Sequence, residues 1–194
     1  MAILKTNPKN LPGPWVDGRV LDNHTVSSAW TGDPFHYDTK RTELGERVYR
    51  LKYGGAIDVI GDIVDTAENF IAEWKPKVDL IVPAPPSRKR SSQPVVEIAK
   101  GLAARLNLPA CEDALLKEQV TTQMKNIKEW SEREKLLRMA IKAGPGDVIG
   151  RSILLIDDLI ESGSTLRCAT EVLLKDGGAS AVYALVLTRT RSRQ

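Results

Sequence analysis

Cysteine, histidine and aromatic residues are all scarce in this chain of 194 residues, which has two cysteines, two histidines and 5% aromatic residues. Cys111 and Cys168 lie far apart and without metal-ligand spacing. This pattern excludes a disulfide framework and a four-cysteine zinc site. His24 and His36 have no clustered carboxylate or thiolate partners in the sequence, so we interpret them as packed or solvated histidines rather than metal ligands.

Long apolar runs and a strong charge of one sign are also missing. No run approaches the roughly 20 residues of a membrane-spanning helix, and the start of the chain is polar and proline-rich, unlike a signal peptide. We therefore expect a soluble, cytoplasmic protein without a membrane partner. The net charge of +3 is too small to predict nucleic-acid binding, and no nucleic-acid motif is present.

The composition that remains is typical of a globular domain, with 42% hydrophobic and 27% charged residues. Residues 1–41 are rich in Pro, Gly, Asp, Asn and Thr and show little periodicity, which predicts an irregular N-terminal segment. From residue 42 onward, helical stripes give way to alternating strands and helices, which predicts an α/β core over 42–194. Residues 113–128 are polar and poorly patterned, and we predict a flexible loop there.

The order of these elements predicts a parallel sheet of about five strands flanked by helices, with ligands beyond the carboxyl ends of the strands. Residues 152–187 form its clearest unit, in which a strand, a loop, a helix and a second strand follow one another. Helices are predicted over 42–54, 56–74, 93–106, 131–142 and 166–176, and strands over 78–83, 108–111, 152–156 and 181–187.

One stretch, ILLIDDLIESGST at 153–165, carries most of the functional information. Its apolar residues place Asp157 and Asp158 at the carboxyl edge of the sheet, and small hydroxylated residues then lead into a helix. Such a helix start can hold a phosphate through backbone N–H groups and hydroxyls, and adjacent carboxylates can accept hydrogen bonds from vicinal hydroxyls. The stretch predicts a ribose 5-phosphate pocket; the alternative is an ordinary strand-end turn with solvated acids.

This stretch resembles the 5-phosphoribosyl-1-pyrophosphate signature of the type I phosphoribosyltransferases, in which two acids precede a Thr-Gly-x-Thr-like loop. The resemblance implies that family's fold, with the N-terminal segment as a hood, and transfer of a phosphoribosyl group between pyrophosphate and a nitrogenous acceptor. Asp157 and Asp158 would bind the ribose hydroxyls. The residues implied to surround the 5-phosphate are Glu161, Ser162, Gly163, Ser164 and Thr165.

Further stretches resemble the ComF-like branch of that family: RLKYGG at 50–55, DLIVPAPPSRKR at 79–90, and LLKEQVTTQMKN at 115–126 followed by SER at 131–133. Members of that branch usually begin with a cysteine-rich zinc-binding segment. This chain has no cysteine before Cys111, so the competence role associated with the branch is not carried over. The resemblance implies pyrophosphate contacts from Ser87, Arg88, Lys89 and Arg90, and flexible-loop contacts from Lys117, Thr122, Gln123 and Lys125.

The resemblance also implies Mg²⁺ held mainly by the substrate's pyrophosphate and hydroxyls, without a direct protein ligand, and we expect a homodimer. Glu161 stands where many members carry a neutral residue. As an anion beside a phosphate it should have a raised pKa, which suits a general base; the alternative is a solvent-facing glutamate.

Two functions stay open. Beside the enzyme, the chain could be a non-catalytic regulatory protein that binds phosphoribosyl pyrophosphate or a nucleotide. The acceptor is not identified by the sequence. We predict that the aromatic side chains of the N-terminal segment pack within the hood; these are Trp15, Trp30 and Phe35. The alternative is that they line the acceptor side of the pocket. For the basic run 88–90, the alternative to pyrophosphate binding is an ordinary surface loop.

Overall fold

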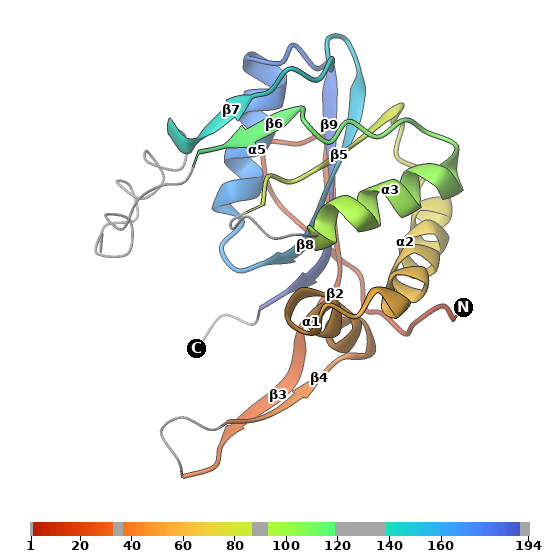
Figure 1. The fold of residues 1–194 in the computed structure, drawn as a ribbon, viewed down its shortest axis with the longest axis vertical. Helices are drawn as coiled ribbons and strands as arrows, with labels where there is room; N and C mark the ends of the chain where they lie inside the picture. The colour runs from red at the N-terminus through yellow and green to blue at the C-terminus, as the bar shows by residue number, and fades with distance from the viewer. Residues whose placement is uncertain (1, 33–36, 87–92, 119–138, 191–194) are drawn as a thin grey trace.

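A computed structural model describes residues 2–32, 37–86, 93–118 and 139–190. Its centre is a five-stranded sheet in the order β1-β2-β9-β8-β5 (Figure 1). Strands β2, β9, β8 and β5 are parallel, and β1 runs antiparallel to β2. The predicted α/β class with a parallel sheet is confirmed. The strands of the sheet are β1 Lys9–Asn10, β2 Asp17–Asn23, β5 Leu80–Pro83, β8 Ser152–Ile160 and β9 Ala181–Arg189.

Helices cover both faces of the sheet. One face packs against α1 (Glu43–Gly54), α2 (Ile60–Trp74) and α3 (Pro94–Leu106), and the other against α5 (Ser164–Lys175). The α5 face is extended by the hairpin of β6 (Leu115–Lys117) and β7 (Ile141–Ala143). The short 3-10 helix η1 (Ile57–Val59) precedes α2. No helix within the described ranges has the length and apolar composition to cross a membrane.

Helix α1 agrees with the prediction because its ends are encoded locally. The Thr42 side chain accepts a hydrogen bond from the Gly45 backbone N–H and so caps the helix N-terminus. Gly55 ends the helix with a left-handed φ of 65°. A Cβ at Gly45 would lie 2.1 Å from the His24 carbonyl oxygen, so this glycine lets α1 approach the end of β2. The position of α1 follows from these residues.

The N-terminal segment differs from the irregular stretch predicted over 1–41. Strand β2 is a full member of the sheet, paired with β9 in parallel from Asp17–Tyr183 to Asn23–Arg189. Strands β3 (Thr25–Trp30) and β4 (Tyr37–Arg41) form a hairpin that projects beyond α1 (Figure 1). The DGRVLDN sequence of β2 has the composition of a turn, and pairing with a strand far along the chain overrides that local preference.

Smaller differences occur elsewhere. β8 continues to Ile160 rather than ending at 156, because its pairing with β9 continues to Arg189. The strand predicted at 108–111 is a single parallel bridge between Ala110 and Ile81. The helix predicted over 131–142 is wrong at its end, where Ile141–Ala143 is strand β7; the part before residue 139 lies outside the described residues.

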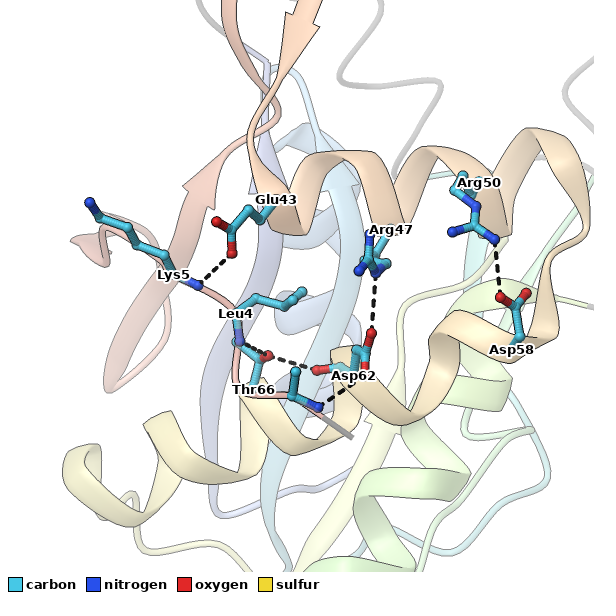
Figure 2. A network of polar contacts seen from close by, with 9 residues as sticks. Leu4, Lys5, Glu43, Arg47, Arg50, Asp58, Asp62 and Thr66 are labelled. Atoms are coloured by element: carbon cyan, nitrogen blue, oxygen red, sulfur yellow. Dashed lines mark hydrogen bonds and ion pairs between the residues drawn. The ribbon is translucent and has the colours of Figure 1, made fainter.

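The first residues of the chain attach to the outer helices (Figure 2). The backbone N–H groups of Ala2 and Leu4 donate to Asp62 and Thr66 of α2, at 3.1 and 3.0 Å, and that of Lys5 donates to Glu43 of α1 at 3.1 Å. Leu4 is buried among the core residues of these helices. The start of the chain therefore ties α1 and α2 together.

Candidate active site

The predicted acids lie at the carboxyl end of β8, on opposite faces of the sheet. Side chains alternate along a strand; Ile153 and Leu155 pack in the α5-side core, and Leu154 and Ile156 in the α1-side core. By this alternation Asp157 faces the α5 side and Asp158 the α1 side. The two acids are neighbours in sequence but meet different surroundings.

Asp158 is buried, with 6% of its surface exposed, and is held at both its side chain and its main chain. Its Oδ1 lies 2.8 Å from Nζ of Lys52 in the last turn of α1. Its carbonyl oxygen accepts a hydrogen bond of 3.1 Å from the Thr188 hydroxyl on β9. A buried carboxylate needs such a partner, because ionisation away from water is otherwise unfavourable.

His24, at the junction of β2 and β3, extends this arrangement. Its Nδ1 lies 3.1 Å from the Thr188 hydroxyl, which already donates to Asp158, so Nδ1 is the donor of this pair. Burial lowers the pKa of His24, and the cations Arg41 and Lys52 lower it further. The neutral ring then bonds Thr188 and carries its lone pair at Nε2. His24 is a packed histidine, as the sequence suggests, but it is linked to the acid-bearing strand.

Asp157 is half-buried, and its carboxylate accepts a 2.9 Å hydrogen bond from the Asp158 backbone N–H. Burial raises the pKa of Asp157 to about 7, and the neighbouring Asp158 carboxylate contributes in the same direction, while Lys52 opposes it. On the same face, burial lowers the pKa of Lys117 in β6, and Asp157 partly offsets that effect. Each acid thus has a lysine on its own face.

We expect the Asp157 carboxylate to destabilise the folded protein at neutral pH. Its pKa of about 7 lies above the ordinary value of 3.8 for an aspartate, so the folded state binds the proton more tightly than the unfolded chain. The contribution of the protonated Asp157 carboxyl to the free energy of unfolding is complete below about pH 4. This contribution is lost as the pH rises to about 7. Asp157→Asn should therefore be more stable than wild type at pH 8, by about 1–4 kcal/mol at 1.4 kcal/mol per pKa unit.

Chemical denaturation at several pH values measures this difference. The gain should shrink as the pH falls toward 4, because the wild-type carboxyl then becomes protonated in the unfolded chain as well as in the folded protein. Asp176→Asn, which removes an exposed carboxylate after α5, serves as the control. If Asp157→Asn raises the free energy of unfolding equally at pH 4 and pH 8, the ionised carboxylate of Asp157 is not the cause of the gain.

The predicted phosphate-binding residues form the turn between β8 and α5. Gly163 has φ of 77° and stands immediately before α5, and a Cβ there would meet nothing within 4 Å. The hydroxyls of Ser162 and Ser164 lie 3.1 Å apart. The first N–H groups of a helix have no intrahelical acceptor and carry a partial positive charge. This open turn is suited to an anion, and Glu161 is exposed beside it.

The structure brings one part of the predicted site together. Asp157, Asp158 and the turn 161–165 share the carboxyl edge, and Lys117 lies within electrostatic reach of Asp157. The predicted pyrophosphate residues 87–90 and the flexible-loop residues Thr122, Gln123 and Lys125 lie outside the described residues. Of the hood aromatics, Trp15 is a core residue, Trp30 is 64% exposed on β3, and Phe35 lies outside the described residues.

Lys52, His24 and Thr188 are neighbours of the acids that sequence reasoning does not assign to the site. For Lys52 a signal exists, because it belongs to the RLKYGG stretch that resembles the ComF-like branch. For the other two no local signal is present. Within the described ranges, no three His, Cys, Asp or Glu side chains are grouped so that they could hold a metal ion.

Comparison with protein families decides the assignment. The sequence profile of the phosphoribosyl transferase domain matches residues 94–194, more than half of the chain. The chain belongs to the phosphoribosyl transferase domain family. The matched part of this phosphoribosyl transferase domain begins with α3 and includes the acids, the turn before α5 and β9.

The chain is also 30% identical to competence protein ComFC of Bacillus subtilis over 149 residues, which are 76% of this chain and 60% of ComFC. The resemblance to the ComF-like branch is thereby confirmed. Among solved structures, glutamine phosphoribosylpyrophosphate amidotransferase from B. subtilis, complexed with ADP and GMP, aligns with a TM-score of 0.52 and 20% identity. That alignment covers 79% of this chain and 34% of the amidotransferase, so the chain spans only part of either relative.

Proposed function

We propose that this phosphoribosyl transferase domain binds 5-phosphoribosyl-1-pyrophosphate and transfers its phosphoribosyl group to a nitrogenous acceptor, with pyrophosphate as the leaving group. The observation that carries the proposal is the shared edge of Asp157, Asp158 and the open turn before α5, within the segment that matches the family. Hydroxyl acceptors beside an anion-binding helix start have the chemistry of a ribose 5-phosphate site.

Each part of the substrate has a proposed contact. Asp157 and Asp158 accept hydrogen bonds from the ribose hydroxyls, and the turn 161–165 surrounds the 5-phosphate. By the family resemblance, the basic stretch 87–90, Lys117 and Lys125 face the pyrophosphate and stabilise its developing negative charge. Lys117 extends from strand β6 rather than from the loop that the sequence predicts over 113–128. The acids fit a Mg²⁺ ion held mainly by the substrate, because Mg²⁺ keeps several waters; when bound, it neutralises pyrophosphate charge.

The N-terminal hairpin is the proposed hood on the acceptor side. β3 and β4 project from the end of the molecule at which β8 and β9 terminate (Figure 1). Trp30 of β3 is largely exposed and offers a planar apolar surface to an aromatic acceptor. Replacing Trp30 should alter the choice of acceptor rather than the affinity for phosphoribosyl pyrophosphate.

We expect phosphoribosyl pyrophosphate with Mg²⁺ to stabilise the protein against unfolding. A ligand at 100 times its dissociation constant adds about 2.7 kcal/mol to the free energy of unfolding. A thermal-shift titration measures the effect, with ribose 5-phosphate and pyrophosphate as partial ligands. Absence of a shift with the complete ligand and Mg²⁺ would count against the proposal.

A second candidate function is regulation without catalysis. The relative at 30% identity is named for competence, a process, and its name states no reaction. Pyrophosphate release with a panel of bases and amines separates the two candidates. Release with one acceptor supports the enzyme, and tight binding without release for every acceptor supports a regulatory protein that binds the same ligand.

A further inference from the structure

We propose that Lys52 is a positioning residue of this site, whose ammonium holds the Asp158 carboxylate in place so that it can accept hydrogen bonds from the substrate's ribose. The inference rests on the proposed function. Lys52 lies outside the 153–165 stretch, and it reaches the site from the last turn of α1, a helix that precedes β8 by about a hundred residues.

Helix α1, which carries Lys52, is held in place on two sides. α1 buries one side against the core, through Leu44, Val48 and Leu51. Its outward flank is bonded to the next elements: Arg47 pairs with Asp62 at 3.2 Å, and Arg50 with Asp58 at 3.0 Å (Figure 2). Successive residues of a helix are about 100° apart around its axis, so Lys52 lies on the opposite flank of the buried side from Arg47 and Arg50. These contacts fix the backbone from which Lys52 extends.

The Lys52–Asp158 pair is largely shielded from water. In the Lys52–Asp158 pair, 22% of the lysine side chain and 9% of the aspartate side chain are exposed. The surface pair Lys100–Glu112 has 48% and 45% exposed. Attraction between charges is stronger where water is excluded, and removing one partner leaves the other uncompensated. The Lys52–Asp158 contact therefore helps to hold the Asp158 carboxylate in position, whereas an exposed pair contributes little.

Asp158 is held at two points, its carboxylate and its main chain. Lys52 contacts Oδ1, and a carboxylate has a second oxygen with its own lone pairs. The main chain of Asp158 is held independently by Thr188, which His24 bonds in turn. Asp158 is thus held at its main chain from β9 and at its carboxylate from α1. Without Lys52, the Asp158 carboxylate loses the ion pair that holds its side chain and leaves a buried charge without this partner, so it is less well placed to accept a hydrogen bond from a ligand.

The test is a double-mutant cycle on the full chain, measured as affinity for phosphoribosyl pyrophosphate with Mg²⁺ by calorimetry. Lys52→Met should weaken binding by about 10–100-fold, the range seen when a group that orients a ligating side chain is removed. Lys52→Arg, which keeps the charge, should restore part of the loss. When Asp158 is already replaced by Asn, Lys52→Met should weaken the affinity little further, because Lys52 acts through Asp158.

Lys100→Met is the matched control, since it breaks an exposed pair on α3, and its affinity should equal that of wild type. Folding of each variant is checked by denaturation; should Lys52→Met fail to fold, Lys52→Gln, which keeps a hydrogen-bond donor, replaces it in the cycle. An unchanged affinity in the folded variant, or an equal loss in both backgrounds, overturns the role of Lys52. Failure of wild type to bind overturns the proposed function instead.

Discussion

Replacing both Asp157 and Asp158 by Asn should weaken phosphoribosyl pyrophosphate binding by about 10²–10⁴-fold and leave the fold intact. Each substitution removes charge-assisted hydrogen bonds to ribose hydroxyls, at a cost of about 1.5–3 kcal/mol. Asn keeps the size of the side chain, and β8 keeps its backbone pairing with β9. Calorimetry with Mg²⁺ present measures the affinity.

The single variants add information that the double variant lacks. Asp158→Asn leaves Lys52 without its carboxylate, so it should lose both affinity and stability. Asp157→Asn should lose affinity while it gains stability at pH 8, because it removes a carboxylate whose ionised form is unfavourable in the folded protein. Asp176→Asn, which removes an exposed carboxylate after α5, is the control. Equal affinity in the double variant and wild type would remove the ribose assignment.

Glu161→Gln should lower the rate of phosphoribosyl transfer by about 10²–10⁴-fold while the substrate still binds, if Glu161 is the general base. Two anions in a partly dry pocket repel, so removing the charge of Glu161 should leave the affinity equal or slightly tighter. Because Glu161 is exposed beside the turn before α5, the substitution should not disturb the core. Initial rates of pyrophosphate release, with the acceptor found by the panel, measure the effect.

The same variant also separates the two interpretations of Glu161. A solvated loop glutamate would leave turnover within a few-fold of wild type, and that result would end the general-base role without touching the binding assignment. Glu171→Gln is a suitable control, since Glu171 lies two turns into α5 and pairs with Lys175 at 3.5 Å. Its turnover should be unchanged.

Local signals account for the parts of this fold that the sequence predicts well. The cap at Thr42, the left-handed Gly55 and the apolar stripe between them define α1 without reference to the rest of the chain. The motif containing Asp157 and Asp158 is likewise contiguous, since the apolar strand residues that deliver the acids and the residues of the turn follow one another. Such features can be read from a short window of sequence.

The parts that the sequence does not predict depend on distant partners. β2 has the composition of a turn, and it is a strand because it pairs with β9 and buries Val20 and Leu21. Lys52 reaches Asp158 only because α1 packs at the edge where β8 ends. Neither contact has a local pattern, so sequence reasoning finds the acids and misses the lysine that holds one of them.

The order of strands in the sheet has a consequence for biosynthesis. β9 is the last described strand to leave the ribosome, yet it lies between β2 and β8 and joins them. Until residues 181–189 emerge, β2 has no partner on that side, and Thr188 cannot bond His24 or Asp158. Pairings between residues so far apart form slowly. A stalled or truncated nascent chain would therefore expose two unpaired strand edges, which invite aggregation or capture by chaperones.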